Sequence, residues 1–329
     1  MEADRKQQLN AVKLASLLKS DRGIDSSGLT PDPAFNRGVA CTLNGSAWIY
    51  ITDDSARALG ASLAWVETKH PDAREVNIVL ESEAGLVARR ARCFSRRINV
   101  FAVHGTSLVE AEPTSIGVPA EAKGAHLALR TLIEDGGAVV VVEHGVVAGE
   151  VYGLEVCRVL DSETDEPRLE VGVGAHDREA FALLHGHLPT VDAIRQHVEA
   201  VRPHREAPIG THPLNRLAAS RLIRSRVIAA PSLIGATSLE VAEPPVARTN
   251  LKDEVPCVAR GRLENGRPVV AVFAHGIDLE VVPFAVDARE WINPDAELVI
   301  VVPERDRHAV LARIAGGVLG GCSVVGVAV

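Results

Sequence analysis

Asn44-Gly45-Ser46-Ala47-Trp48-Ile49-Tyr50-Ile51, near the start of the chain, is matched near its end by Asn265-Gly266-Arg267-Pro268-Val269-Val270-Ala271-Val272. In both places an apolar run precedes Asn-Gly and another follows it. Asn-Gly between two such runs is the strongest short-range signal for a β-hairpin. The sequence therefore predicts the same hairpin twice, with strands at 39–43 and 47–52 in its first occurrence.

The similarity continues beyond the two hairpins. A Pro-Asp-Ala triplet, an apolar strand, a helix with an Ala-Arg pair and a last apolar strand follow in both places. The matched segments are, in order, 71–73 with 294–296, 76–80 with 298–302, 86–89 with 310–313, and 98–103 with 324–329. Solenoid repeats are much shorter than this period. We therefore expect residues 37–103 and 256–329 to share one fold through internal duplication.

The middle of the chain follows a different pattern. A helix is predicted at 121–134, where Gly136-Gly137 closes it. The later elements predicted from apolar periodicity are strands at 138–143, 146–160 and 169–173, helices from 176 and from 191, and a helix at 214–228. The last helix corresponds to one expected at 9–18. The predicted fold class is α/β, with two related α/β units, residues 1–110 and 206–329, flanking a distinct central α/β unit, residues 111–205.

The composition is that of an ordinary globular protein of about two domains. The chain has 329 residues, of which 47% are hydrophobic, 24% charged and only 3% aromatic. Val, Ala, Leu and Ile must therefore build the core, which suits buried parallel strands. No apolar run reaches the ~20 residues of a membrane span, and residues 1–6 do not begin a signal peptide. These features favour a cytoplasmic protein without a membrane partner.

The cysteines indicate neither a zinc site nor a disulfide framework. There are five, Cys41, Cys93, Cys157, Cys257 and Cys322, and none forms a Cys-x-x-Cys pair. Cys41 and Cys257 precede the two Asn-Gly turns at apolar positions, so we expect them to be buried. The common nucleotide, zinc-protease and serine-hydrolase motifs do not occur either, which disfavours dehydrogenase, kinase and serine-hydrolase functions.

Arginines gather in one stretch of an otherwise acidic chain. The formal net charge is −8, which argues against a broadly basic nucleic-acid-binding surface. Between 202 and 226, however, a single acid, Glu206, stands among Arg202, Arg205, Arg216, Arg221, Arg224 and Arg226. A local basic patch of this kind is typical of phosphate or nucleic-acid binding. The alternative is a set of solvated helix faces with arginines near helix C-termini.

Two acids of the central region stand inside apolar strands. Glu155 lies in Gly153-Leu154-Glu155-Val156-Cys157, and Glu170 lies in Leu169-Glu170-Val171. A carboxylate in such a position costs free energy unless it is paired or binds something. Two of them on neighbouring strands suit a hard divalent cation, Mg²⁺ or Mn²⁺. The alternative is a solvent-facing side of the sheet, where Glu155 pairs with Arg158 or Arg168.

The central region resembles the PD-(D/E)xK nuclease superfamily. A helix, three strands with acids on the second and third, and a further helix form the pattern at 120–180. The resemblance implies that Glu155 and Glu170 bind the metal that activates water. The lysine of the motif is replaced by Gly172. A cation beside the water would then come from Arg158, Arg168 or His176.

The whole chain also resembles a bacterial protein family that implies no particular activity. The short sequence segments that carry this resemblance are residues 153–159, 170–180, 212–217 and 250–253. One of them contains Gly174-Ala175-His176-Asp177, a glycine turn followed by polar residues at a helix start. Such a turn suits an anion, with His185 and His187 nearby, or is a plain helix cap formed by Asp177.

Two function classes remain open from the sequence. One is a metal-dependent enzyme acting on nucleic-acid phosphodiesters, with Glu155, Glu170, Arg158 and His176 as catalytic residues and Glu155 and Glu170 as metal ligands. Its nucleic-acid contacts would be Arg202, Arg205, Arg216, Arg221 and Arg224. The other is a non-catalytic interaction or scaffold protein with a degenerate nuclease-like fold. The two copies differ after the second strand, Asp53-Asp54 against His275 and Asp278. This mismatch favours scaffold use of the flanking copies.

Overall fold

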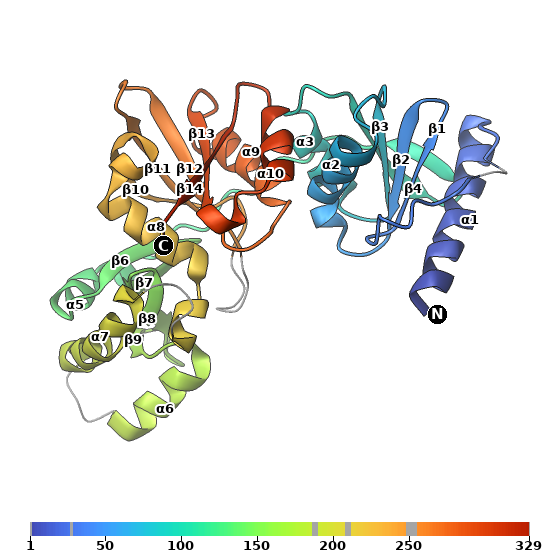
Figure 1. Cartoon of the computed structure of the whole chain (residues 1–329). Coiled ribbons are helices and arrows are strands. Elements are labelled where there is room, and N and C mark those ends of the chain that lie inside the picture. Colours follow the sequence, from blue (N-terminus) through green and yellow to red (C-terminus); the bar gives the residue numbers. More distant parts are fainter. Residues whose placement is uncertain (1, 27–28, 186–189, 208–211, 248–254, 329) are drawn as a thin grey trace. The chain divides into compact units, whose positions relative to one another are not determined.

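The computed structural model describes residues 2–26, 29–185, 190–207, 212–247 and 255–328. The described residues form an α/β fold with three sheets, and the chain divides into two compact units (Figure 1). The first unit comprises residues 1–116, 278–287 and 308–323, and the second comprises residues 117–277, 288–307 and 324–329. Among the described residues, no helix is long and apolar enough to cross a membrane.

The first unit contains a five-stranded sheet in the order β1-β2-β3-β4-β5. Its strands are β1 (Val39–Leu43), β2 (Ser46–Ile51), β3 (Val76–Leu80), β4 (Ile98–His104) and β5 (Ser107–Glu110). The three middle strands are parallel, and the two outer strands are antiparallel to their neighbours. Its helices are α1 (Glu2–Arg22), η1 (Ser55–Arg57), α2 (Ala58–Lys69), α3 (Ala84–Ala91), the first part of α9 (Val281–Ile292) and α10 (Ala309–Gly316).

The first Asn-Gly hairpin forms at the predicted place. Asn44 and Gly45 have φ angles of 51° and 79°, so both adopt the left-handed conformation that a two-residue type I′ turn requires. Leu43 and Ser46 are the last paired residues on either side of it. One face of this sheet is buried by α1, whose Leu14, Leu17 and Leu18 belong to its core.

The described residues of the second unit form two sheets. The four-stranded sheet has the order β6-β7-β8-β9, and its strands are β6 (Val139–Glu143), β7 (Val146–Val151), β8 (Leu154–Asp161) and β9 (Pro167–Val171). The five-stranded sheet has the order β10-β11-β12-β13-β14, and its strands are β10 (Ala236–Ala242), β11 (Cys257–Leu263), β12 (Pro268–Phe273), β13 (Glu297–Pro303) and β14 (Ser323–Val327). All four strands of the first of these sheets are antiparallel.

Helices of the second unit connect and cover these sheets. They are α4 (Gly124–Leu127), α5 (Arg130–Asp135), α6 (Ala175–His185), α7 (Thr190–Glu206), η2 (Pro213–Arg216), α8 (Ala219–Ala229), η3 (Pro231–Ile234) and η4 (Glu304–Asp306). α8 supplies Ile223 and Val227 to the core beneath β10–β14. Cys257 lies in this core and Cys41 in that of the first sheet, so their predicted burial is confirmed.

The two five-stranded sheets share an arrangement of four strands. β1-β2-β3-β4 and β11-β12-β13-β14 have the same order along their sheets. In each, the first pair is antiparallel around Asn-Gly and the second pair is parallel. They differ in the fifth strand, because β5 extends the first sheet beyond β4, whereas β10 extends the second sheet beyond β11.

Three of the predicted elements were wrong in the central region and the segment that follows it. The strand expected at 146–160 is a hairpin, because Tyr152 and Gly153 both have positive φ and form a turn inside the apolar run. The helix expected at 121–134 is two short helices, α4 and α5. The helix expected at 214–228 is broken between η2, which ends at Arg216, and α8, whose N-cap residue Ala218 has a φ of 48°. Apolar periodicity alone does not reveal such local reversals.

Candidate charged site on the four-stranded sheet

The four-stranded sheet has one apolar face and one charged face. Its apolar face packs against α5 and α7 through residues such as Val147, Val159 and Ile194. On the other face, Val141, Ala148, Arg158 and Glu170 stand directly opposite one another across the four strands. Residues opposite one another in paired strands share a face. Arg158 and Glu170 therefore lie side by side on the face away from the apolar core.

A β-bulge brings Glu155 to the same face. Gly149 pairs with Cys157 and Glu150 with Glu155, so one step along β7 corresponds to two residues on β8. Val156 is the extra residue, and such an insertion changes the face on which the following residues point. Without it, strand alternation would place Glu155 beside Cys157 in the apolar core. The bulge thus puts Glu155 on the charged face, where Glu150 lies by alternation two residues after Ala148.

Arginines flank the two acids of the predicted metal site. Glu155 is only 3% exposed and accepts two hydrogen bonds of 2.8 Å from Nε and Nη2 of Arg158. Glu170 forms an ion pair with Arg168. Arg178, from the first turns of α6, lies 3.3 Å from Glu155 and 3.5 Å from Glu170. Its guanidinium therefore bridges the two carboxylates.

A second set of buried charges extends this face toward α8. Arg221 forms ion pairs with both Glu143 and Glu150. Arg224, only 1% exposed, lies 2.6 Å from Glu143 and 3.5 Å from Glu150. Burial disfavours the charged form of Glu143, but Arg224 and Arg221 outweigh it and lower the pKa of this carboxyl below its ordinary value. Burial likewise opposes the charge of Arg221, while Glu150 and Glu143 raise its pKa.

We call the four acids Glu143, Glu150, Glu155 and Glu170, together with the five arginines Arg158, Arg168, Arg178, Arg221 and Arg224, the charged network. A cavity of about 70 Å³ opens between its two halves and is lined by Glu143, Glu155, Arg158 and Arg221. His144 also lines it and donates its backbone N–H to Glu243 at 2.6 Å. The network thus holds nearly balanced charge around a space the size of a few water molecules.

The predicted basic surface is wrong for three of its five arginines. Arg221 and Arg224 form buried ion pairs within the charged network, and Arg205 is fully buried. Arg205 donates to the backbone carbonyls of Tyr152, Leu214 and Leu217, and burial lowers its pKa to about 10. These side chains satisfy internal acceptors that would otherwise be buried without donors.

The other two predicted nucleic-acid contacts, Arg202 and Arg216, are exposed. Arg202 donates to the carbonyl of Gly137 at 3.2 Å. Two exposed arginines that stand on separate helices, α7 and η2, do not make the patch that the sequence predicted.

His176 does not join the predicted catalytic residues. Its side chain is fully exposed and its nearest acid is Glu179, at 4.0 Å. Asp177 instead accepts a hydrogen bond of 2.6 Å from the backbone N–H of Val173 and lies 3.1 Å from His197. The turn that the sequence suggested for an anion is thus already occupied by a carboxylate of the chain. The described residues do not include His187, the side chain of His185 or the segment 250–253.

The residues that the sequence assigned to Mg²⁺ or Mn²⁺ do not fit such an ion. A hard cation needs several oxygen ligands, whereas Glu155 and Glu170 are bridged and flanked by guanidinium groups. Arginine stays protonated in proteins, so it cannot yield its place by losing a proton. Among the residues whose placement is described, no group of three or more His, Cys, Asp and Glu side chains could hold a metal ion.

The sequence only weakly indicates the arginine that lies between Glu155 and Glu170. Arg178 follows the Gly174–Asp177 turn directly, but nothing in the sequence indicated that it points back to β8 and β9. Glu143 and Glu150 stood among the acids of the central region, yet only the fold places them beside α8. Comparisons of the chain with protein-family models, with curated proteins and with solved structures found no match.

Proposed function

We propose that this chain is a non-catalytic interaction or scaffold protein. The observation that carries the proposal is the position of Arg178, whose guanidinium lies between Glu155 and Glu170 at 3.3 and 3.5 Å. In the metal-dependent alternative, the same space would belong to the cation. A positively charged side chain there supplies the compensating charge from within the chain.

The charged network is suited to holding elements together. It joins α6 to β8 and β9 through Arg178, and α8 to β6 and β7 through Arg221 and Arg224. Buried ion pairs add little net stability compared with apolar packing, but removing one partner is strongly destabilising. Such a network therefore favours one arrangement of the sheet and its helices over alternatives. A fixed arrangement is what a binding or scaffold protein needs.

We further propose that the two five-stranded sheets are copies of one ancestral unit. The shared strand order and the two Asn-Gly hairpins support this proposal. Polar residues at matching positions have different partners. Asp54, after β2, pairs with Arg37 at 2.8 Å, whereas His275, after β12, lies 3.1 Å from Arg305. A duplicated catalytic site would retain the same groups twice, so the difference favours scaffold use of both copies.

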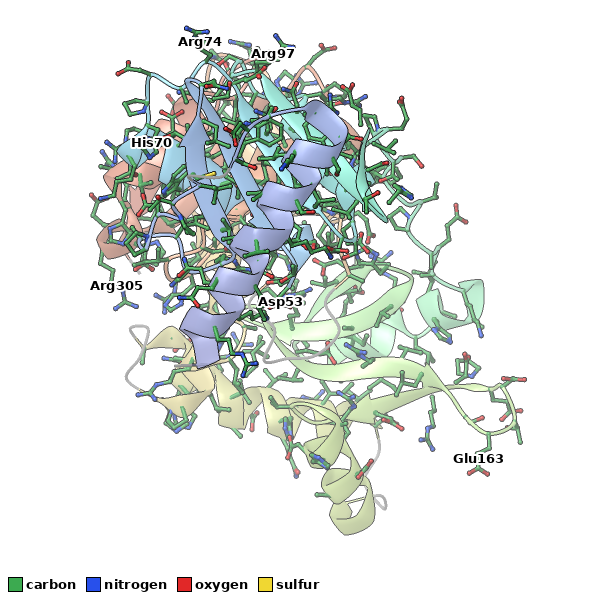
Figure 2. All side chains as sticks on the ribbon, turned by 90° about the vertical axis from the view of Figure 1, so that its right-hand side faces the viewer. Asp53, His70, Arg74, Arg97, Glu163 and Arg305 are labelled. Atoms are coloured by element: carbon green, nitrogen blue, oxygen red, sulfur yellow. The ribbon has the colours of Figure 1, made fainter. Side chains whose placement is uncertain are left out.

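The decisive experiment is a metal titration of the full chain. We expect neither Mg²⁺ nor Mn²⁺ to raise the thermal midpoint, and no metal-dependent cleavage of single- or double-stranded DNA or RNA. Cleavage that requires Mn²⁺ and is lost in Glu155→Gln and Glu170→Gln, but retained in Glu163→Gln, would overturn the proposal. Glu163 is a suitable control because it is exposed between β8 and β9 (Figure 2).

A further inference from the structure

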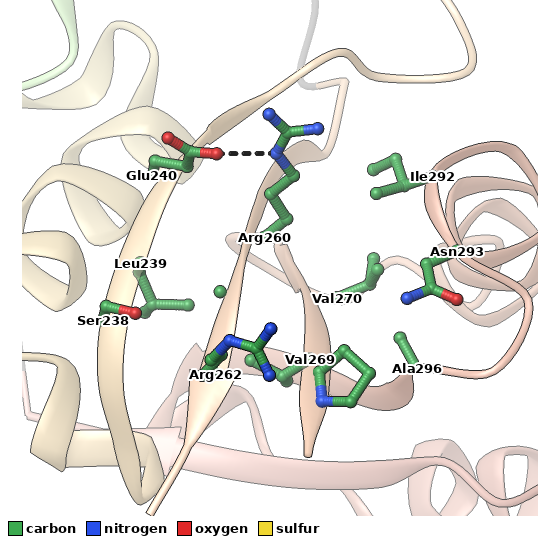
Figure 3. Close-up of a pocket in the computed structure, with 12 residues that line it drawn as sticks. Ser238, Leu239, Glu240, Arg260, Arg262, Val269, Val270, Ile292, Asn293 and Ala296 are labelled. Carbon is green, nitrogen blue, oxygen red and sulfur yellow. Dashed lines mark hydrogen bonds and ion pairs between the residues drawn. The ribbon is translucent and has the colours of Figure 1, made fainter. Parts of the chain in front are cut away.

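A polar-walled pocket opens on the five-stranded sheet of the second unit. It has a volume of about 520 Å³ and lies over β10, β11 and the start of β12, beside the end of α9 (Figure 3). Pockets that bind small molecules typically measure about 300–1,000 Å³. It shares no lining residue with the cavity of the charged network. It is therefore a separate candidate site.

The floor of this pocket is apolar. Pro268 and Ile292 line it with partly exposed side chains, beside the buried Ala296. Val270 pairs with Arg260 and faces the same side of the sheet but is fully buried, whereas Val269 points to the core on the opposite side. Covering exposed apolar surface of this kind with a ligand removes it from water, which is favourable. The floor therefore suits the hydrocarbon body of a small molecule.

Two arginines of one strand form the charged wall. Arg260 and Arg262 are separated by one residue on β11, so strand alternation directs both to the same face (Figure 3). Arg260 uses Nε to bind Glu240 at 2.7 Å, and its two terminal nitrogens have no partner among the described residues. Arg262 donates Nη1 to the carbonyl of Gly266 at 3.0 Å. Donors therefore remain on both guanidinium groups.

The opposite wall adds a neutral polar group. Asn293, just beyond α9, turns its carboxamide toward the strands (Figure 3). Gly261 between the two arginines allows β10 to approach, because a Cβ there would overlap the carbonyl of Ser238. The wall that carries Ser238 and Glu240 thus depends on the absence of a side chain at this position.

The first sheet has no equivalent of this charged wall among its described residues. On the second hairpin, Arg260 of β11 pairs with Val270 of β12. At the matching position of the first hairpin, Ala40 of β1 pairs with Ile49 of β2. There the backbone N–H of Asp32 donates to the carbonyl of Ala40, and Trp65 donates its indole N–H to Asp32 at 2.8 Å. The two arginines therefore distinguish this sheet from the first.

We infer that this pocket binds a small organic anion, with its oxyanion group at Arg260 and Arg262 and its apolar body on Pro268 and Ile292. Guanidinium groups bind carboxylate and phosphate oxygens with paired hydrogen bonds, which makes either oxyanion suitable. The inference goes beyond the proposed scaffold function, and it does not rest on the charged network, because the two sites share no residues.

Calorimetric titration of the full chain tests this inference with four probes. Phenyl phosphate and benzoate carry both features, inorganic phosphate lacks the apolar body, and benzyl alcohol lacks the charge. We expect one or both of the first two to bind with a Kd of about 0.1–1 mM, which is ordinary for a ligand of this size. Their relative affinities identify the preferred oxyanion. Inorganic phosphate and benzyl alcohol should bind about tenfold more weakly or not at all, because each lacks one of the two interactions.

Variants connect the binding to the pocket. Arg262→Gln and Arg260→Gln should each weaken binding of the preferred probe about tenfold, the effect of one lost charge-assisted hydrogen bond. Arg267→Gln is the matched control, because Arg267 lies on the same hairpin, pairs with Glu297 and does not line the pocket. Absence of binding by both aromatic anions would overturn the inference. Equal affinity of the control and both pocket variants would overturn it as well.

Discussion

We predict that Glu155→Gln lowers the free energy of unfolding of the full chain by about 2–3 kcal/mol in the absence of any metal. The substitution keeps the shape of the side chain and removes its charge. The glutamine side chain would retain one oxygen for the two N–H groups that Arg158 directs to Glu155 at 2.8 Å. The predicted loss therefore measures the charge interaction within the network.

The magnitude follows from the burial of the groups involved. Breaking a fully buried ion pair costs about 3–5 kcal/mol, because the remaining charge is left without compensation. Glu155 is 4% exposed in its side chain, but Arg158 is 30% exposed and water reaches it. Arg178 is 11% exposed and keeps Glu170 as a partner. Both factors reduce the cost below the fully buried value.

Urea unfolding followed by far-UV circular dichroism measures this change. Glu163→Gln is the matched control, since it removes the same charge from an exposed turn between β8 and β9 and should alter the free energy by less than about 0.5 kcal/mol. A metal site without its metal gives the opposite result, because neutralising one of two neighbouring carboxylates relieves their repulsion. If the Glu155→Gln protein is as stable as the wild type, or more stable, then Arg158 and Arg178 do not compensate the buried charge of Glu155, and the reasoning is refuted.

Three further predictions concern other buried positions. Arg224→Met should destabilise the chain by about 3–5 kcal/mol in the same urea assay, because Glu143 and Glu150 would share Arg221 alone; a neutral effect would contradict this reason. Gly153→Ala should lower the free energy of unfolding by at least about 2 kcal/mol, since Gly153 has a φ of 76° and a Cβ would overlap the Arg221 backbone. Gly105→Ala is the control: Gly105 has a φ of 63° but open space around it, so its substitution should lower the free energy of unfolding by only about 1–2 kcal/mol. Burial raises the pKa of Glu280 from 4.5 to about 7, so the folded chain binds more protons than the unfolded chain between these values. The free energy of unfolding should therefore fall as pH rises through this window, and an unchanged pH dependence in Glu280→Gln would show that another group is responsible.

Local sequence signals identified those elements whose cause is itself local. Asn44-Gly45 indicated the turn, because few residues other than Asn and Gly adopt two left-handed conformations in succession. The apolar run at 76–80 indicated β3 with its bounds as predicted, since a short β-branched segment between turn residues favours a strand. The turn at Tyr152-Gly153 was missed because a tyrosine with positive φ is uncommon and apolar residues surround it.

The candidate site was only partly accessible from the sequence. The sequence indicates that Glu155 and Glu170 are carboxylates that need a partner within apolar strands, and Arg158 does pair with Glu155 and Arg168 with Glu170. The face on which Glu155 lies depends on the bulge at Val156, which the sequence did not indicate. Arg205, Arg221 and Arg224 were assigned to the surface because their spacing resembles a basic patch. Spacing along a helix does not reveal which face another element covers.

By itself, the sequence determined the α/β class, the two Asn-Gly hairpins and the presence of carboxylates that apolar strands cannot hold alone. These are properties of short segments, and the physical forces behind them act between residues near one another in the chain. The tertiary structure decided what compensates each charge. Arg178 reaches Glu155 from 23 positions away, and Arg221 reaches Glu150 from 71 positions away. A carboxylate in a strand can be satisfied equally by a metal ion, by water or by a guanidinium group, and only the packing of α6 and α8 on the four-stranded sheet selects the guanidinium.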